Sequence, residues 1–166
     1  MKKYAIIVAG GMGSRMNNTI PKQFLLLNGK PVLYYSIDAF LRAYDDLQII
    51  LVLPEEHVAA GQEVIDAFFD YSRIQITIGG QTRFDSVKNG LQLVAEESIV
   101  FVHDAVRCLV TVDLIQRCCD AAVEIGSAIP VVTLGIYLAS AKSDVGVPEL
   151  IPPAAIIFPS ACKAMA

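Results

Sequence analysis

Short apolar runs rich in isoleucine and valine alternate along the chain with longer stretches whose apolar residues recur at helical spacing. The short runs predict five strands, at Tyr4–Val8, Gln48–Leu53, Ile74–Ile78, Ile99–His103 and Ala128–Val132. The longer stretches predict four helices, at Pro31–Ala43, Glu55–Phe69, Thr82–Ala95 and Thr111–Ile125. Strands that alternate with helices of this length are typical of an α/β fold with a mainly parallel sheet.

Several helix boundaries carry residues that favour them. Thr82 and Thr111 can act as N-caps, because their hydroxyl oxygens can accept from a free backbone N–H. Gly126 follows the last long helix, where a C-cap is expected. Pro31 follows a turn at Asn28-Gly29 and suits the first residue of a helix.

Polar and glycine-rich segments directly follow three of the predicted strands. They are Ala9-Gly10-Gly11-Met12-Gly13-Ser14-Arg15-Met16, Gly79-Gly80-Gln81-Thr82-Arg83 and His103-Asp104-Ala105-Val106-Arg107. In parallel sheets the ligand sits beyond the carboxyl ends of the strands. We therefore expect these three loops to form one site.

The first loop has the composition of a phosphate seat. Its glycines let the backbone approach a ligand closely and point N–H groups at an anion. Arg15 and Lys22 add two positive charges to the same region. The loop indicates a site for a triphosphate, although an ordinary strand-to-helix turn stays an alternative because short glycine motifs also occur by chance.

The third loop combines a carboxylate with an arginine. Asp104 at a strand end is a natural ligand for Mg²⁺, or alternatively a cap of the next turn. Arg107 can grip a phosphate through two hydrogen bonds, or lie on the surface as an ordinary arginine. His103 points to the opposite face of its strand, which favours a packed position under the sheet over a role as general base.

The second loop leads into a helix on which Arg83, Ser86 and Gly90 share one face. Ser86, one turn into the helix, can hydrogen-bond a nucleotide base or sugar, or remain a solvated helix serine. Gly90 costs about 1 kcal/mol relative to alanine inside a helix, which indicates close packing there.

Composition limits the classes of function. The 166 residues fit one domain, with 54% hydrophobic and 18% charged residues and a net charge of −4. This balance excludes a surface that coats nucleic acid, so a phosphate ligand must be held by a local cluster. We find no signal-peptide pattern, no membrane-spanning apolar run, and no metal-ligand spacing among the four cysteines. We therefore expect a cytoplasmic protein with reduced thiols, no membrane association and no nucleic-acid partner.

Phosphate-binding cations, a carboxylate for Mg²⁺ and an arginine for a second substrate together suggest nucleotidyl transfer. In that reaction a phosphate oxygen of one substrate attacks the α-phosphorus of a nucleoside triphosphate, and pyrophosphate leaves. The protein contributes orientation and charge neutralisation. Lys22 and Arg15 would stabilise the α-phosphoryl group and the pyrophosphate.

As an ordered set, the three loop segments resemble the signature motifs of the IspD-type cytidylyltransferases. The first of them extends to Pro21-Lys22-Gln23-Phe24 and the second to Phe84-Asp85-Ser86-Val87, while Cys108 stands where the third usually continues with proline. The resemblance covers about residues 1 to 132. It implies a Rossmann-like nucleotidyltransferase fold with helices on both faces of the sheet, and the Mg²⁺-dependent reaction of CTP with 2-C-methyl-D-erythritol 4-phosphate in non-mevalonate isoprenoid synthesis.

The resemblance also implies roles for individual residues. Arg15 and Lys22 would be the catalytic cations, Asp104 would hold Mg²⁺ and touch the substrate, and Arg107 would help to place the sugar phosphate. The residues expected to contact CTP are Ala9, Gly10, Gly11, Gly13, Gly80, Arg83 and Ser86.

From Leu134 onward the sequence departs from the family's pattern, so 134–166 is expected to be an atypical or incomplete C-terminal part of a single 1–166 domain. The family's projecting dimer arm, its Thr-Pro-Gln segment and its late lysine are not recognisable there. A homodimer is therefore expected from the resemblance alone. Two alternatives stay open: a pentitol-phosphate cytidylyltransferase that acts on ribitol 5-phosphate, and a CTP-binding module without activity.

Overall fold

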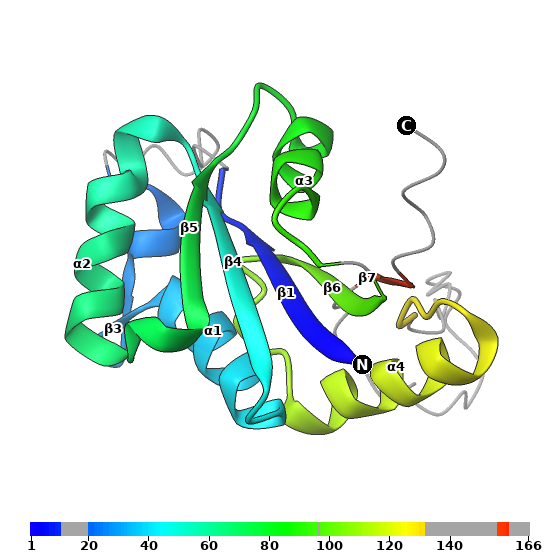
Figure 1. Ribbon diagram of the computed structural model, residues 1–166. Helices are drawn as coiled ribbons and strands as arrows, with labels where there is room; N and C mark the ends of the chain where they lie inside the picture. The colour runs from blue at the N-terminus through cyan, green and yellow to red at the C-terminus, as the bar shows by residue number, and fades with distance from the viewer. Residues whose placement is uncertain (11–19, 96, 132–155, 160–166) are drawn as a thin grey trace, which may run out of the picture.

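A five-stranded sheet forms the centre of the computed structural model, which describes residues 1–10, 20–95, 97–131 and 156–159 (Figure 1). The strand order is β5-β4-β1-β6-β7. Four strands run parallel, and the edge strand β7 pairs antiparallel with β6. Their bounds are β1 (Lys2–Val8), β4 (Leu47–Leu53), β5 (Ile74–Ile78), β6 (Ser98–Asp104) and β7 (Ile156–Pro159).

The central strands are buried on both faces, as the uninterrupted apolar runs predicted. Nearly every residue of β4 and β6 is buried, and so is the second half of β1. Parallel strands covered by helices on both sides read as continuous hydrophobic runs rather than as alternating ones. Four of the five predicted strands are confirmed, each within a residue or two of its predicted bounds.

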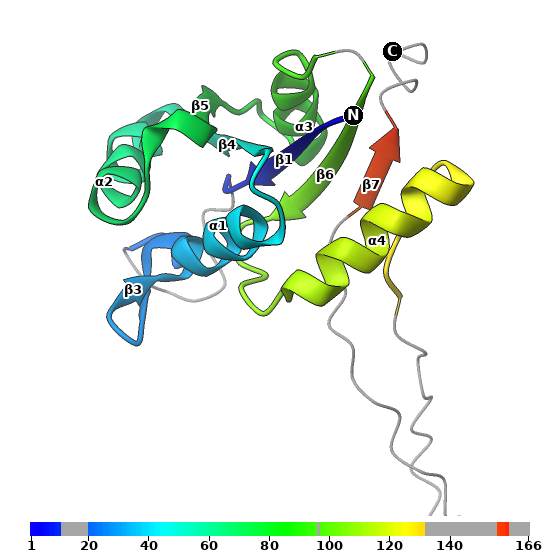
Figure 2. The same cartoon turned by 60° about the horizontal axis from the view of Figure 1, so that its bottom comes forward.

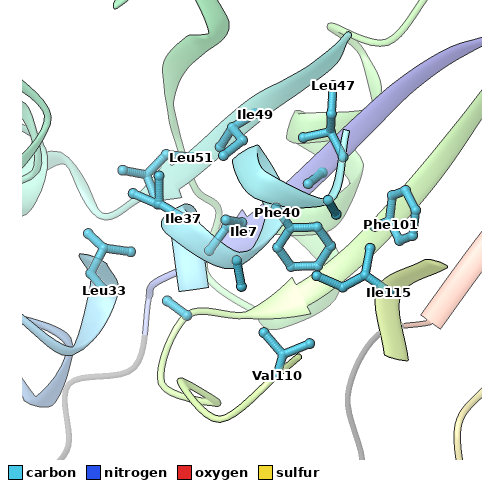
Figure 3. Close-up of a cluster of buried hydrophobic side chains, with 14 of the residues drawn as sticks. Ile7, Leu33, Ile37, Phe40, Leu47, Ile49, Leu51, Phe101, Val110 and Ile115 are labelled. Atoms are coloured by element: carbon cyan, nitrogen blue, oxygen red, sulfur yellow. The ribbon is translucent and has the colours of Figure 1, made fainter. Parts of the chain in front are cut away.

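Helices cover both faces of the sheet (Figure 2). On one face, α1 (Val32–Ala43), α2 (Val58–Phe68) and α4 (Val112–Ile125) contribute to a large core that contains Phe40, Phe101 and Ile115 (Figure 3). On the other face, α3 (Arg83–Leu91) packs against a smaller cluster of valines and isoleucines from β1, β4 and β6. Cys118 and Cys119 on α4 are buried in the larger core as small apolar side chains.

The predicted helix caps are confirmed. The hydroxyl of Thr82 accepts from the backbone N–H of Asp85, and Thr111 accepts from Leu114. Gly126 has a φ of 92°, the left-handed conformation that ends α4. Asn28 and Gly29 both have positive φ values, 50° and 79°, in the turn between β2 (Leu26–Leu27) and β3 (Lys30–Pro31).

Three predicted elements differ from the structure. The helix predicted from Glu55 begins as a 3₁₀ turn, η3 (Glu55–His57), and becomes α-helical at Val58. The helix predicted to reach Ala95 ends at Leu91, before turn and bend residues. The strand predicted at 128–132 is wrong over its described residues: Ala128 makes an isolated bridge, and the exposed residues Ile129 and Val131 flank Pro130, which has no N–H to donate to a ladder.

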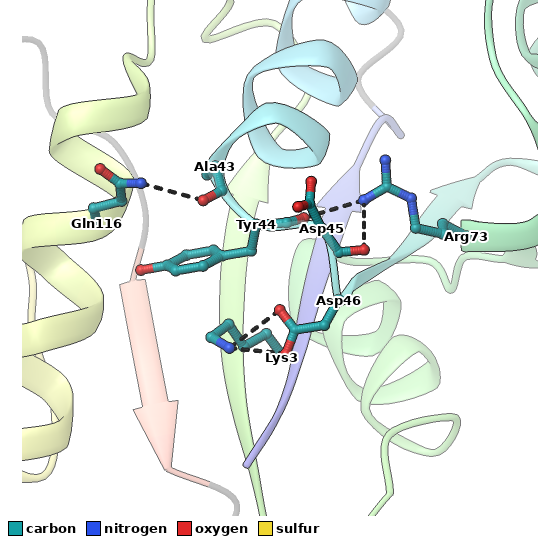
Figure 4. A network of polar contacts seen from close by, with 7 residues as sticks. All are labelled: Lys3, Ala43, Tyr44, Asp45, Asp46, Arg73 and Gln116. Carbon is teal, nitrogen blue, oxygen red and sulfur yellow. Dashed lines mark hydrogen bonds and ion pairs between the residues drawn. The ribbon is translucent and has the colours of Figure 1, made fainter.

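A polar network holds the amino ends of the strands together, at the edge of the sheet opposite the candidate site (Figure 4). Nη1 of Arg73, in η4 (Tyr71–Arg73), donates to the carbonyl oxygens of Tyr44 at 3.1 Å and Asp45 at 3.0 Å. Lys3 pairs with Asp46 at 3.0 Å. Gln116 donates from α4 to the carbonyl of Ala43 at 3.2 Å.

No helix in the described residues has the length and apolar character that a membrane crossing requires.

Candidate active site

Three loops leave the sheet at its carboxyl edge: those after β1 and β6 follow neighbouring strands, and the one after β5 is separated from them by β4. In each loop the first residue continues the hydrogen bonding of the neighbouring strand: Ala9 N–H donates to Val52 O, Gly79 N–H to Leu53 O, and Ala105 N–H to Val8 O, at 2.8 to 2.9 Å. These bonds fix the exits of β1, β5 and β6 relative to one another. The expectation that the three polar segments meet in one site is therefore correct for their described residues.

A cavity of about 540 Å³ lies where these loops converge. Its size falls within the range of small-molecule sites, about 300 to 1,000 Å³. It is lined by Val8, Ala9, Gly10, Lys22, Gln23, Pro54, Gly79, Gly80, Gln81, Thr82, Arg83, Ser86, Asp104, Val106 and Arg107. The charged side chains among these described residues are three cations and one carboxylate, in a protein whose net charge is −4.

The N-terminus of α3 forms one wall of the cavity. Thr82 and Asp85 form a capping box, in which each side chain accepts from the backbone N–H of the other residue. Oγ of Ser86 accepts from Gly80 N–H at 3.2 Å and donates to Thr82 O at 3.0 Å. Ser86 is thus buried and holds the glycine turn against the helix, so its interpretation as a solvated helix serine is wrong.

Positions 79 and 80 require glycine because a side chain has no room there, and not because the backbone has a positive φ. A Cβ built on Gly79 would lie 2.8 Å from Oγ of Ser86, and one on Gly80 would collide with Cβ of Asp85. The loop therefore runs close to the start of α3, and its backbone borders the cavity. Gly90 shows the same constraint deeper in the helix, because a Cβ there would lie 2.7 Å from Cγ2 of Ile6, as the expectation of close packing implied.

Asp104 sits between two arginines. Nε of Arg83 donates to Oδ1 at 2.9 Å, and Nε of Arg107 donates to Oδ2 at 2.9 Å. Burial alone raises the pKa of Asp104, but the hydrogen bonds and charges of Arg107 and Arg83 outweigh it and leave the pKa below its ordinary value. The carboxylate is therefore ionised at neutral pH and fixes both guanidinium groups at the cavity wall.

Lys22 lines the cavity from the 3₁₀ turn η2 (Lys22–Phe24). Pro21 precedes the turn with extended backbone, and Phe24 N–H donates to its carbonyl at 2.9 Å. Phe24 packs edge-on against His57 with ring centroids 5.8 Å apart. The turn is thus held by its own hydrogen bonds and by an aromatic contact to η3.

The structure brings together Ala9, Gly10, Lys22, Gly80, Arg83, Ser86, Asp104 and Arg107 from the predicted site. Gly11, Gly13 and Arg15 lie outside the described residues. Arg107 is not an isolated surface arginine, because it pairs with Asp104 in the cavity wall. The assignment of roles in catalysis and in CTP binding stays a prediction.

His103 occupies the place predicted for it. Its side chain is 1% exposed and packs edge-on against Phe40 of α1, on the face opposite to Asp104. Neither ring nitrogen forms a regular hydrogen bond with a described residue. Burial lowers the pKa of His103 to about 4, so the ring is neutral at pH 7 and does not border the cavity.

Sequence reasoning missed two features of the site. The Arg83–Asp104 pair joins residues 21 positions apart, and nothing local in the sequence indicates it. Gln23 lines the cavity but is 1% exposed, although glutamine in a polar, proline-containing segment is usually exposed. The signal in the sequence that could have pointed to Gln23 as a site residue was its position next to Lys22.

The single carboxylate that lines the described part of the cavity is compatible with a magnesium ion that arrives with a nucleotide. Asp104 is the sole carboxylate lining the described part of the cavity, and the described residues hold no cluster of three or more potential metal-binding side chains. Mg²⁺ in nucleotide sites is commonly bound by one or two carboxylates together with phosphate oxygens and waters. Each oxygen of Asp104 keeps a further lone pair beyond its arginine bond.

Comparisons with known proteins found a matching family model and named relatives. The model of the family described as IspD, 2-C-methyl-D-erythritol 4-phosphate cytidylyltransferase, matches residues 4–148. A relative with that name from Bacteroides thetaiotaomicron is 48% identical over 133 residues, which cover 80% of this chain and 60% of the relative. A relative with the same name from Clostridium perfringens is 38% identical over 129 residues, which cover 78% and 57%.

Solved structures share the fold. A 4-diphosphocytidyl-2C-methyl-D-erythritol synthase from Anaerococcus prevotii superposes with a TM-score of 0.74 at 21% identity, covering 97% of this chain and 72% of that one. A second structure with that synthase name has a TM-score of 0.72 at 25% identity, covering 96% and 75%. The α/β fold with helices on both faces is thereby confirmed. The chain spans about 60% of the length of the curated relatives that it matches.

Proposed function

Because the chain belongs to the IspD family of 2-C-methyl-D-erythritol 4-phosphate cytidylyltransferases, we propose that its cavity binds CTP and transfers the CMP group to a sugar-alcohol phosphate. The acceptor is 2-C-methyl-D-erythritol 4-phosphate. Its phosphate oxygen forms a bond to the α-phosphorus of CTP while the bond between the α-phosphorus and the bridging oxygen breaks. The products are 4-diphosphocytidyl-2-C-methyl-D-erythritol and pyrophosphate.

The observation that carries this proposal is the distribution of charge around the cavity. Lys22 and the Arg83–Asp104–Arg107 cluster line the same cavity. The backbone of Ala9 and Gly10 at the end of β1 lines it as well. A triphosphate placed there meets three cations and a glycine-containing backbone, which suits a reaction in which negative charge spreads over phosphate oxygens.

The roles proposed for individual residues come from the family resemblance, and the described ones among them line the cavity. Lys22 donates to the α-phosphoryl oxygens and stabilises the charge that develops during transfer, together with Arg15. Gly80, Ser86 and the backbone of Ala9 and Gly10 contact the nucleotide, as do Gly11 and Gly13, which lie outside the described residues. Arg83 contacts CTP, and Arg107 orients the phosphate of the acceptor.

Asp104 would hold Mg²⁺, because it is the carboxylate among the described residues that line the cavity. When bound, the ion neutralises phosphate charge and favours departure of pyrophosphate. Asp104 also keeps its two arginines in place before any ligand arrives, which preserves the geometry of the cavity. Removal of divalent cations should therefore abolish turnover while leaving the fold intact.

The choice of acceptor and the assembly of the chain also belong to the proposal. The names of the curated relatives support 2-C-methyl-D-erythritol 4-phosphate over ribitol 5-phosphate. A cytoplasmic homodimer follows from the family resemblance. Both acceptors can be offered to the same preparation, so the choice between them is directly measurable.

The test is pyrophosphate release by this chain with CTP, Mg²⁺ and 2-C-methyl-D-erythritol 4-phosphate, compared between wild type, Lys22→Ala and Lys30→Ala. Lys30 is a matched control, because its ammonium lies 3.9 Å from the ring centroid of Tyr34 and it is not among the residues that line the cavity. Loss of a charge-stabilising donor lowers kcat by about 100-fold or more, so Lys22→Ala should do this while Lys30→Ala changes kcat less than about twofold.

Full activity of Lys22→Ala would refute its role. Faster turnover with ribitol 5-phosphate than with 2-C-methyl-D-erythritol 4-phosphate would show that ribitol 5-phosphate is the acceptor. CTP binding measured by calorimetry without turnover of either acceptor would favour the binding-module alternative.

A further inference from the structure

Gln23 links two of the chain segments that line the cavity. Its side chain is 1% exposed, and Nε2 donates to the carbonyl oxygen of Ala9 at 3.0 Å, across 14 positions of the chain. Ala9 is the first residue after β1, and Gln23 follows Lys22 within η2. The amide thus connects the backbone expected to contact the nucleotide with the turn that carries the expected catalytic lysine.

The two partners of this bond are held differently. Ala9 is fixed to the sheet, because its N–H donates to Val52 O at 2.8 Å and the residues before it belong to the central strand. The Lys22 turn lies outside the sheet and is closed by two short-range bonds, Phe24 N–H to Pro21 O at 2.9 Å and Leu25 N–H to Lys22 O at 3.3 Å. The far end of the turn has further anchors, because Phe24 packs against His57 of η3 and Val32 N–H donates to Leu25 O at 2.9 Å. Loss of the bridge would therefore loosen the end of the turn that carries Lys22 and leave Ala9 in place.

Burial makes the bridge costly to replace by water. A glutamine amide with two donors and an acceptor is seldom enclosed unless it is bonded, because burial of an unpaired polar group is unfavourable. Here Nε2 has a partner while Oε1 is buried and has none among the described residues. Burial of Oε1 without a partner among these residues is unfavourable, yet the side chain still joins η2 to the end of β1 through Nε2. This indicates that the position of the bond matters.

From these contacts we infer that Gln23 is the positioning residue of Lys22: it ties the lysine turn to the end of β1 and so sets the place of the ammonium in the cavity. The inference rests on the proposed function in taking Lys22 as the group that acts on the transferred phosphoryl. In this role Gln23 acts through Lys22 and not on the reacting atoms. Its removal should lower kcat and leave the KM for CTP nearly unchanged, since Ala9 and Gly10 stay where the sheet holds them.

The experiment compares Gln23→Met with Gln116→Leu. Methionine keeps the length of the side chain and removes the donor. Gln116 is the matched control, because it also donates a side-chain amide to a distant backbone carbonyl, that of Ala43, but at the opposite edge of the sheet (Figure 4). Gln23→Met should lower kcat by about 10- to 100-fold with less than a threefold change in KM, as small misplacements of catalytic groups do. Gln116→Leu should leave both constants unchanged.

Hydrogen exchange gives a readout that needs no turnover. In Gln23→Met the amides of Phe24 and Leu25 should exchange faster than in wild type, while those of β1 and β4 should not. If the wild type shows no turnover, the proposed function fails, and these amides still decide whether Gln23 holds the turn. Unchanged exchange, or an equal loss of kcat in both variants, would overturn the inference.

One measurement on the unaltered protein covers the case in which Gln23→Met does not fold. The side-chain amide protons of Gln23 should exchange with solvent much more slowly than those of the exposed Gln75. Equal rates would overturn the inference, because a bridge that opens as readily as an exposed amide cannot fix the lysine turn.

Discussion

Protonation of one buried histidine should make the fold sensitive to mild acid. The pKa of His103 is lowered to about 4 in the folded protein, from an ordinary value of 6.5, because burial disfavours the charged ring. A group of this kind stabilises the fold above pH 6.5, and that stability is lost as the pH falls through 6.5 towards 4, because the unfolded chain binds the proton first. With these two values, lowering the pH from 7 to 4.5 costs about 2 kcal/mol through His103.

The assay is urea unfolding of wild type and His103→Leu at several pH values between 7 and 4.5. Carboxylates titrate in both proteins, so the difference between the two stabilities isolates the histidine. The variant should gain about 2 kcal/mol relative to wild type over this range. A difference between wild type and His103→Leu that does not change with pH would refute the argument that burial holds the ring neutral.

Two further predictions concern α3, which forms a wall of the cavity. Thr82→Ala removes the hydroxyl that accepts from Asp85 N–H and should lower the free energy of unfolding by about 1 kcal/mol, measured by urea unfolding; no change would mean that the cap contributes nothing here. Gly90→Ala gains about 1 kcal/mol in helix propensity but places a Cβ 2.7 Å from Cγ2 of Ile6, and overpacking costs about 1 to 3 kcal/mol. The variant should therefore melt at a lower temperature than wild type, and a higher melting temperature would show that Ile6 gives way without strain.

The parts of the fold that could be predicted are those fixed by local pattern. Apolar runs located β1, β4, β5 and β6, because strands buried on both faces need no polar alternation. Threonine and glycine located the ends of α3 and α4, because caps satisfy backbone groups within three or four residues.

The errors arose where distant contacts or a single residue overrode the pattern. The run at 128–132 is apolar enough for a strand, but Pro130 interrupts it. The helix predicted to continue to Ala95 ends at Leu91 in the structure. The antiparallel strand β7 was not predicted, because Ile156–Pro159 is too short and its surroundings are too uniform in composition. Its pairing with β6 depends on the sheet already being present.

The site could be located from sequence but not assembled from it. The rule that ligands bind beyond the carboxyl ends of parallel strands brought the right loops together. It could not say that Asp104 bonds both Arg83 and Arg107, since that pairing depends on β6 lying close enough to the start of α3. The burial of Gln23 likewise depends on how η2 folds back onto β1.

The Arg83–Asp104–Arg107 cluster also explains how an acidic protein can keep a cationic cavity. Two guanidinium groups held side by side would repel each other, and one carboxylate between them offsets that repulsion while leaving one net positive charge on the cluster. Each pair is half-exposed, so its contribution to stability is about 1 kcal/mol or less. The value of the carboxylate therefore lies in the geometry of the two donors. Because Lys22 lines the same cavity, an anion that enters it meets donors already in place, and the fold supplies this without a positive charge on the protein as a whole.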